Sequence, residues 1–273
     1  MAEGNYRHGG YKKFRISDPK PRIIHKASVR DRLSHHAIYR ILYPYFDRLF
    51  ICDSFSCRIG KGTHAALNRF RKMSLKVGQN NTKTVWILKC DIRKYFACVD
   101  QDILINIIEK YVSDRQVVAL LKEVIVSFNS GVSGKGIPLG NLTSQLFANI
   151  YLNELDQYLK RGLKVKNYIR YADDFVILAD NKKYLYLLIP IIARFLKDRL
   201  KLKLHPDKVS IKTLFSGIDF LGWVHFPDHR VLRTVSKNRM FFKIGKNPCN
   251  ESLQSYLGLL KHGNAFKIRQ SIL

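Results

Sequence analysis

The sequence predicts an α+β fold in which helices pack against one mostly antiparallel sheet. Three observations support this prediction: a strand-rich start, several stretches with apolar residues at helical spacing, and apolar strands joined by short turns. Hydrophobic residues make up 46% of the 273 residues, which is enough for a large core. We find no internal repeat and no low-complexity linker, so we expect no sharp domain boundary.

The elements follow from periodicity, turn residues and helix breakers. A β-hairpin is expected over 10–26, with a turn at 18–21, and a helix over 28–50, which Pro44 kinks or divides. A short strand is expected over 55–62, running into a glycine loop. The later expected elements are a helix from about 63, a strand over 85–91, helices over 100–110, 114–128 and 141–159, a glycine-rich loop over 131–140, a hairpin over 168–178, a helix over 181–200, strands over 208–214 and 218–226, and a helical tail from about 235, broken between 245 and 248.

Two adjacent acids, Asp173 and Asp174, are expected at the tip of the second hairpin, between apolar flanks. Adjacent carboxylates repel unless a cation neutralises them, and Mg²⁺ prefers carboxylates together with water and substrate phosphates. Asp91 ends another apolar strand. Packed beside the hairpin tip, it would help hold two ions roughly 3.5–4 Å apart, the arrangement used for nucleotidyl transfer. A solvated β-turn is the alternative for an isolated Asp-Asp pair.

The formal net charge is +27 and the pI is about 10.0, which indicates a polyanionic partner, by default nucleic acid. An anionic membrane surface is the weaker alternative, because the positive charges do not fall on one amphipathic helix. From Arg230 onward the chain is rich in Lys and Arg and carries a single acid, Glu251. Such a segment suits contacts with a nucleic-acid backbone, although a merely soluble surface would have the same composition.

The five cysteines show no paired spacing, so we expect reduced thiols in a cytoplasmic protein and no zinc site. His35 and His36 are predicted on a helix surface. The N-terminus lacks the features of a signal peptide, and the longest apolar stretch, 184–193, is too short to span a bilayer. We therefore expect no membrane association.

Several motifs occur in one order, and together they resemble a reverse transcriptase across nearly the whole chain. They are Asp18 to Arg22, Cys57 to Gly62, Asp91 to Phe96, Gly136 to Gln145, Tyr171 to Asp174, Leu204 to Lys208 and Phe220 to Trp223. The resemblance implies a right-hand polymerase fold, with an antiparallel palm sheet backed by helices and a short basic helical thumb. The implied domains are fingers with part of the palm over 1–90, a palm with the catalytic hairpin over 91–234, and a partial thumb over 235–273.

The loop-helix motif, Gly136 to Gln145, is similar to that of one subgroup of reverse transcriptases. Most bacterial reverse transcriptases carry Gln-Gly and Ser-Pro in the loop-helix motif, where this chain has Leu139-Gly140 and Ser144-Gln145. This form is similar to the reverse transcriptases of diversity-generating retroelements, which are bacterial or phage-encoded. Those enzymes copy a template-repeat RNA into cDNA, misincorporate opposite adenines and bind a small basic accessory protein. The implied partners are therefore template RNA, cDNA, dNTPs and such a protein.

The resemblance also assigns roles to single residues. Asp91, Asp173 and Asp174 would hold two Mg²⁺ ions, or Mn²⁺, with the Ile92 carbonyl as a further ligand. Lys208 would protonate or hold the pyrophosphate. The implied substrate contacts are the triphosphate for Arg22, Arg58 and Lys61, the incoming sugar for Phe96, and the nascent base pair for Leu139, Gly140 and Gln145.

Other readings of the same motifs stay open. A retron, CRISPR-associated or group II intron-type reverse transcriptase would catalyse the same reaction as the enzyme of a diversity-generating retroelement but would serve another biological process. A catalytically idle relative would bind RNA without extending a primer. A palm-domain nucleotide cyclase also carries paired acids on a hairpin, but the basic charge and the motifs of 18–62 disfavour it.

Overall fold

The computed structural model describes residues 6–17, 21–246 and 249–272. Within these residues the strands form three antiparallel sheets, so the expectation of one sheet was wrong. The first sheet pairs β1 (Lys12–Ile16) with β2 (Arg22–Lys26). The central sheet has the order β4-β5-β3-β6, formed by Tyr168–Tyr171, Asp174–Ala179, Trp86–Asp91 and Ser210–Thr213. The third sheet consists of β7 (Ile218–Phe220), β8 (Trp223–His225) and β9 (Arg230–Leu232).

The central sheet is buried on both faces. Successive side chains of a strand point to opposite faces. In β3, Leu88 and Cys90 belong to one hydrophobic core while Ile87 belongs to the other. In β5, Phe175 and Val176 are divided in the same way. Both strands are mostly apolar in the sequence because both of their faces are covered, and their charged residues are Lys89 and Asp91 in β3 and Asp174 in β5.

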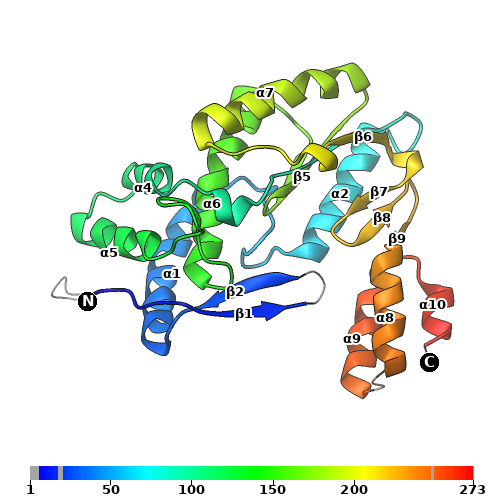
Figure 1. Cartoon of the computed structure of the whole chain (residues 1–273). Coiled ribbons are helices and arrows are strands. Elements are labelled where there is room, and N and C mark those ends of the chain that lie inside the picture. Colours follow the sequence, from blue (N-terminus) through cyan, green and yellow to red (C-terminus); the bar gives the residue numbers. More distant parts are fainter. Residues whose placement is uncertain (1–5, 18–20, 247–248, 273) are drawn as a thin grey trace.

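Helices cover the two faces of the central sheet (Figure 1). On one face, α7 (Lys182–Leu200) packs on β3, β5 and β6, while α2 (Thr63–Val77) packs on β4 and β5 from the other. α1 (Val29–Leu49) lies along α6 (Leu142–Gln157), which continues as a π-helical turn, Tyr158–Gly162. The remaining helices of this half are α3 (Tyr95–Cys98), α4 (Gln101–Glu109) and α5 (Arg115–Val126).

The structure contradicts one of the two alternatives for Pro44, and it also contradicts the strand expected over 55–62. α1 runs without interruption through Pro44, so the proline does not divide the helix. Residues 55–62 form turns in place of the expected strand, with only an isolated bridge from Ser54 to Arg170. The backbone of this segment bonds to the β4–β5 hairpin and to itself, as when Gly62 N donates to Phe55 O. It therefore has no continuous strand partner.

The glycine-rich loop at 131–140 contacts the N-terminal hairpin. His25 N of β2 donates to Leu139 O at 3.0 Å. Gly140 has φ +110°, and a Cβ at this position would lie 2.6 Å from Ile24 Cγ2. Glycine is therefore required here both for the backbone angle and for the close approach. The predicted turn between the two strands falls mainly on 18–20, outside the described residues.

The C-terminal part differs in detail from the expectation. The strand expected over 218–226 is divided into β7 and β8 by a turn in which Leu221 and Gly222 both have positive φ. Short 3₁₀ turns, Pro206–Lys208 and Leu214–Ser216, flank β6. The tail forms α8 (Thr234–Lys246), α9 (Asn250–Leu260) and α10 (Phe266–Gln270), so the predicted break between 245 and 248 agrees with the structure, while Pro248 lies outside the described residues.

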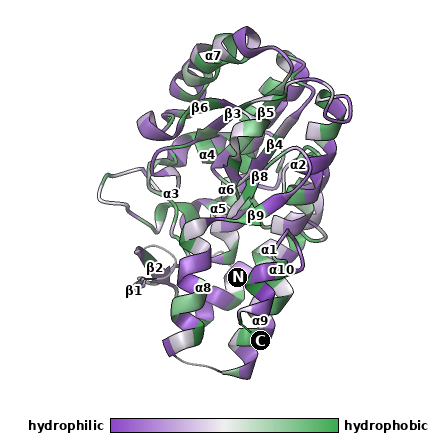
Figure 2. Cartoon of the chain, turned by 90° about the vertical axis from the view of Figure 1, so that its right-hand side faces the viewer, coloured by the Kyte–Doolittle hydropathy of each residue, from purple (hydrophilic) through white to green (hydrophobic). Residues whose placement is uncertain are grey.

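In Figure 2, α8 and α9 lie side by side at one end of the molecule, and both carry hydrophilic and hydrophobic stretches. Their inward residues include Met240 and Leu260, which join the core beside the third sheet. Across the described chain, no helix is both long and apolar enough to cross a membrane.

His35 is buried, contrary to the expectation of a surface position, because α1 packs against the start of α6. Its Nδ1 lies 2.5 Å from Thr143 Oγ1, and its Nε2 lies 3.1 Å from His8 Nε2. Burial and the neighbouring His8 lower the pKa of His35 to about 4. His36 is exposed, as expected.

The buried His35 predicts a pH-dependent stability. The unfolded chain protonates this imidazole near its ordinary pKa of 6.5, whereas the folded chain resists protonation until about pH 4. Stability from His35 is therefore present above pH 6.5 and is lost as the pH falls from 6.5 to 4. In urea titrations, His35→Gln should show a shallower loss over this interval than the wild type. Equal slopes for the two proteins would contradict the prediction, and His36→Gln serves as the control.

Candidate active site

The end of β3 meets the tip of the β4–β5 hairpin. In the sheet register Asp91 lies directly opposite Asp174, and Ile92 N donates to Asp173 O at 3.1 Å. The turn at Ala172 and Asp173 closes the hairpin, and Ala172 has φ +54°, which is uncommon for a residue with a side chain. The three acids, from distant segments of the chain, are thus brought together at one end of the central sheet.

Asp91, Asp173 and Lys208 line one open pocket of about 470 Å³, together with Ile92 and His205. Lys208 Nζ lies 3.0 Å from both carboxylate oxygens of Asp91. His205 N donates to Asp91 O at 2.7 Å and ties the segment that carries Lys208 to the end of β3. A positive charge is therefore fixed beside two of the acids.

Asp174 contacts a second lysine. Its Oδ2 lies 3.7 Å from Lys89 Nζ, and Lys89 also donates to the backbone oxygen of Asp219 at 2.5 Å. The other oxygen, Asp174 Oδ1, is buried without a hydrogen-bond partner. Burial raises the pKa of Asp174 to about 7, Lys89 opposes this shift, and the charges of Asp91 and Asp173 add to it.

Burial also raises the pKa of Asp173. A backbone hydrogen bond opposes this shift, the charge of Asp91 adds to it, and Lys208 and Arg22 oppose it. Two carboxyl groups with raised pKa values lie next to a third carboxylate. Such a cluster stores electrostatic repulsion that a bound cation would relieve.

No group of three or more His, Cys, Asp or Glu side chains lies close enough to form a ready-made metal site in the described ranges. Lysines pair with the carboxylates of Asp91 and Asp174, which balances part of their charge. The donor set nevertheless fits a hard divalent cation, since it offers carboxylate oxygens and one buried oxygen, Asp174 Oδ1, still lacks a partner. The residues present therefore suit Mg²⁺.

Arg58 has a different role from the triphosphate contact that was expected. Its side chain is only 6% exposed, and its guanidinium bonds to the carboxylate and backbone oxygen of Asp47 and to the carbonyls of Ile51 and Ser54. All three of its nitrogens are used in holding the turns of 51–58. In this structure Arg58 stabilises the loop and is not available to a nucleotide.

The other two basic residues expected near a triphosphate are less enclosed. Lys61 Nζ donates to Cys52 O at 2.9 Å and lies over the Phe55 ring, at 5.2 Å from its centroid. Arg22, at the start of β2, is exposed, and its charge acts on Asp173. The hairpin therefore places Arg22 within electrostatic reach of the acid cluster.

The residues expected around the sugar and the base pair are linked through the backbone. Phe96 is half-buried, and its carbonyl accepts from Ile137 N at 2.8 Å. The same loop continues to Leu139, which is half-buried, and to Gly140, which is exposed. Gln145, on the first turns of α6, is half-buried. Phe96 and the glycine loop are thus neighbours in the structure.

Three polar residues of this region were not singled out from the sequence. Lys89 interrupts an apolar strand two residues before Asp91, so it lies on the same face of the strand as that acid. This spacing could have identified Lys89 as a site residue from the sequence. His205 acts through its backbone, which no side-chain pattern reveals. Arg170 is fully buried beneath the hairpin. Its position in a short strand did not allow this burial to be predicted from the sequence.

The three acids meet at one end of the central sheet, and comparison with known proteins shows the family to which the chain belongs. Residues 12–225 match the model of the reverse transcriptase (RNA-dependent DNA polymerase) family. This match covers well over half of the chain, and the chain therefore belongs to that family.

Among curated proteins, the chain is 27% identical to protein YkfC of Escherichia coli over 81% of its own length and 66% of that protein. It is 23% identical to the group II intron-encoded protein LtrA of Lactococcus lactis, over 89% of this chain and 49% of LtrA. Among solved structures, apo telomerase from Candida tropicalis matches with a TM-score of 0.62 and 11% identity, over 81% of this chain and 48% of the telomerase chain. The telomerase match shows the fold alone. The chain spans between about half and two thirds of these relatives.

Proposed function

We propose that the protein is an RNA-directed DNA polymerase that extends a primer on an RNA template. The observation that carries this proposal is the meeting of Asp91 with the Asp173–Asp174 hairpin tip, where Asp91 and Asp173 line one pocket with Lys208. Membership of the reverse transcriptase family supports the reaction class. The net charge of +27 supports a nucleic-acid substrate.

The chemistry is assigned to the acid cluster. Asp91, Asp173 and Asp174 would hold two Mg²⁺ or Mn²⁺ ions, with the Ile92 carbonyl beside them. Bound there, the ions would supply a lowered pKa for the attacking 3′-hydroxyl and neutralise the leaving pyrophosphate. Lys208, already 3.0 Å from Asp91, would turn toward the departing phosphates and donate a proton to them.

Substrate positioning is assigned to the residues around this cluster. Arg22 and Lys61 would bind the triphosphate as fixed positive charges. Phe96 would lie under the incoming sugar and exclude a 2′-hydroxyl by its bulk. Leu139, with Gly140 and Gln145, would border the nascent base pair.

The proposed domain organisation follows the right-hand polymerase plan. We assign fingers with part of the palm to 1–90, palm to 91–234 and a partial thumb to 235–273. The basic α8–α10 segment would grip the template–primer backbone, since contacts with phosphates depend on charge and not on sequence.

The biological subtype is proposed to be that of a diversity-generating retroelement, with error-prone cDNA synthesis and a small basic accessory protein as partner. Leu139 and the Ser144-Gln145 pair support it. A group II intron-type enzyme is the second candidate, which the similarity to the intron-encoded LtrA favours.

Primer extension tests the function. The purified chain is incubated with Mg²⁺, dNTPs and a DNA primer annealed to an RNA template. Extended products are expected, with rNTPs used far less well because of Phe96. RNA binding in the absence of any extension, with or without added accessory protein, would replace the proposal with that of an idle RNA-binding relative.

Leu139→Gln tests the subtype. Leu139 offers no hydrogen-bonding group to the nascent pair, so a glutamine there should restore polar selection of the incoming base. We expect the error rate opposite template adenine to fall by about tenfold, the equivalent of ~1.4 kcal/mol of added discrimination. Sequencing of the cDNA products measures the rate, with errors opposite cytosine as the internal reference. An unchanged adenine error rate would remove Leu139 as the cause.

A further inference from the structure

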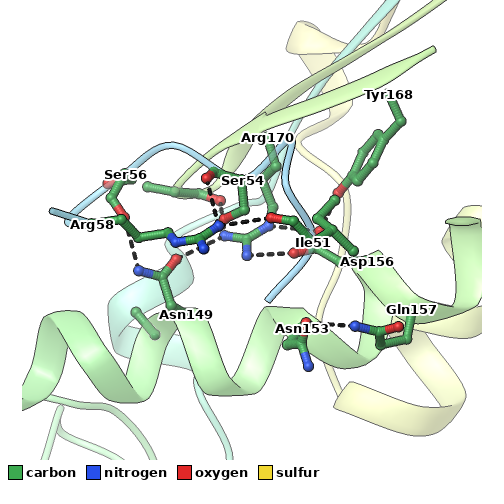
Figure 3. Close-up of polar contacts among 12 residues, drawn as sticks. Ile51, Ser54, Ser56, Arg58, Asn149, Asn153, Asp156, Gln157, Tyr168 and Arg170 are labelled. Atoms are coloured by element: carbon green, nitrogen blue, oxygen red, sulfur yellow. Dashed lines mark hydrogen bonds and ion pairs between the residues drawn. The ribbon is translucent and has the colours of Figure 1, made fainter. Parts of the chain in front are cut away.

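A buried ion pair lies directly beneath the acidic hairpin. Arg170 of β4 and Asp156 of α6 are both completely buried (Figure 3). Arg170 Nε lies 2.8 Å from Asp156 Oδ1, and Arg170 Nη2 lies 2.6 Å from Asp156 Oδ2. Tyr168 Oη donates to Asp156 Oδ1 at 2.7 Å, so the carboxylate is satisfied on several sides. This paired geometry fixes the orientation of the guanidinium.

The third guanidinium nitrogen, Nη1, which does not contact Asp156, reaches the hairpin turn. Arg170 Nη1 donates to Ala172 O at 3.1 Å and to Asn149 Oδ1 of α6 at 3.2 Å. Ala172 is the residue with positive φ, and it immediately precedes Asp173. The guanidinium therefore holds the carbonyl of the peptide bond that joins Ala172 to Asp173.

The backbone of Arg170 fixes a second segment. Arg170 N donates to Asp53 O at 3.0 Å, and Arg170 O accepts from Phe55 N at 3.0 Å. Asn149 adds a third link, because its Nδ2 donates to Ser56 O at 2.9 Å. The loop 53–56, which leads to Lys61, is thereby joined to the same residue as the hairpin turn.

We propose that Arg170 is a positioning residue that sets the Ala172–Asp173 turn and the loop 53–56 against α6 as one rigid unit. This inference rests on the proposed polymerase function for its kinetic consequence, but its structural claim stands independently. Arg170 does not touch the pocket that Asp173 lines. It acts through the backbone on either side of that pocket, by holding the turn that aims Asp173 and the loop that precedes Lys61.

A purely stabilising ion pair is the competing explanation. Replacing a buried pair by apolar groups is often tolerated, so burial alone does not show a functional role. The two explanations differ in what happens at the turn. If Arg170 positions the turn, a folded variant that keeps the charge but loses the fork geometry should misplace Asp173, whereas a stabilising pair should change only the melting temperature.

Arg170→Lys is the informative variant, because an ammonium can pair with Asp156 but cannot reach Asp156, Asn149 and Ala172 together in a planar fork. We expect kcat for primer extension to fall about 10²-fold, as for a catalytic group displaced by ~1 Å, with KM for dNTP changed less than about twofold. Hydrogen–deuterium exchange should accelerate in peptides that cover 53–57 and 170–175.

Tyr151→Phe is the control, because Tyr151 lies on α6, the helix that carries Asn149 and Asp156. It removes a buried hydrogen bond to Leu200 O and a partly buried one from Asp100 N, neither of which involves the hairpin. It should lower the melting temperature without faster exchange in 170–175 and without a comparable loss of kcat.

Asn149→Leu is the second test variant, and it replaces Arg170→Lys if that variant does not fold. It keeps the ion pair, removes the links to Ser56 and Arg170, and should accelerate exchange in both peptides.

The proposal is overturned if folded Arg170→Lys keeps wild-type exchange in 170–175, or if its kcat stays within twofold of wild type. If Arg170→Lys does not fold, unchanged exchange in Asn149→Leu overturns it. If the wild-type protein extends no primer, the polymerase function fails, and the exchange comparison still decides whether Arg170 rigidifies the turn and the loop together.

Discussion

Asp173→Asn is expected to reduce primer extension by about 10³-fold or more, because loss of a metal-binding carboxylate removes several kcal/mol of transition-state stabilisation. Asp173 lies in the hairpin turn and lines the pocket with Asp91 and Lys208. Asparagine has nearly the same shape and can remain in the turn, but its amide binds a divalent cation weakly. Single-turnover extension on an RNA template, with Mg²⁺ varied, measures the effect.

The melting temperature distinguishes the loss of activity in Asp173→Asn from unfolding of the variant. Burial raises the pKa of Asp173, so the folded chain disfavours its charged form and a neutral side chain should not lower the melting temperature. Asp198→Asn is the charge-matched control, since Asp198 is an exposed acid near the end of α7. Asp173→Asn protein that retained a tenth of wild-type extension would exclude Asp173 as a metal ligand.

Lys208→Met is expected to lower kcat by about 10²-fold, the lower end of what a positioned proton donor contributes. Lys208 Nζ lies 3.0 Å from both oxygens of Asp91 and lines the same pocket as Asp91 and Asp173. Methionine preserves the length and the apolar stem but removes the charge and the proton. Pre-steady-state incorporation of one dNTP gives the rate.

Reversal of the reaction provides a second measurement. A group that protonates the leaving pyrophosphate in extension must deprotonate it in pyrophosphorolysis, so both rates should fall in parallel. Lys212→Met, at an exposed position on β6, is the control for loss of one positive charge. A selective increase in KM with unchanged kcat would instead assign Lys208 to ground-state binding of the triphosphate.

Much of the fold was predictable because its signals are local. The N-terminal hairpin and the helices α2, α4, α5 and α7 agree with their predictions, since amphipathic periodicity and N-cap residues such as Asp100, Asp114 and Asn181 act within a few residues. The hairpin with Asp173 at its tip was likewise a short-range prediction. The division of the strands into three sheets was not, because each short strand alone is compatible with several partners.

The candidate site was predictable to a different extent at each position. The encounter of Asp91 with Asp174 followed from placing one acid at the end of a strand and the other at a hairpin tip, and the sheet register agrees with it. The expectation for Arg58 failed, because Asp47 of α1 approaches it only after the chain has folded. The pairing of Lys208 with Asp91 joins residues 117 positions apart, and spacing alone cannot specify it.

The sequence by itself determined the class of the protein, since the order of its motifs, its acids and its basic charge are written along the chain. Only the tertiary structure decided which polar residues are enclosed. His35, Arg58 and Arg170 look like surface residues in a one-dimensional pattern, yet each is buried with specific partners. The physical reason is that burial and the strength of a charge interaction depend on distance through space and on exclusion of water, and both are set by contacts between segments far apart in the chain.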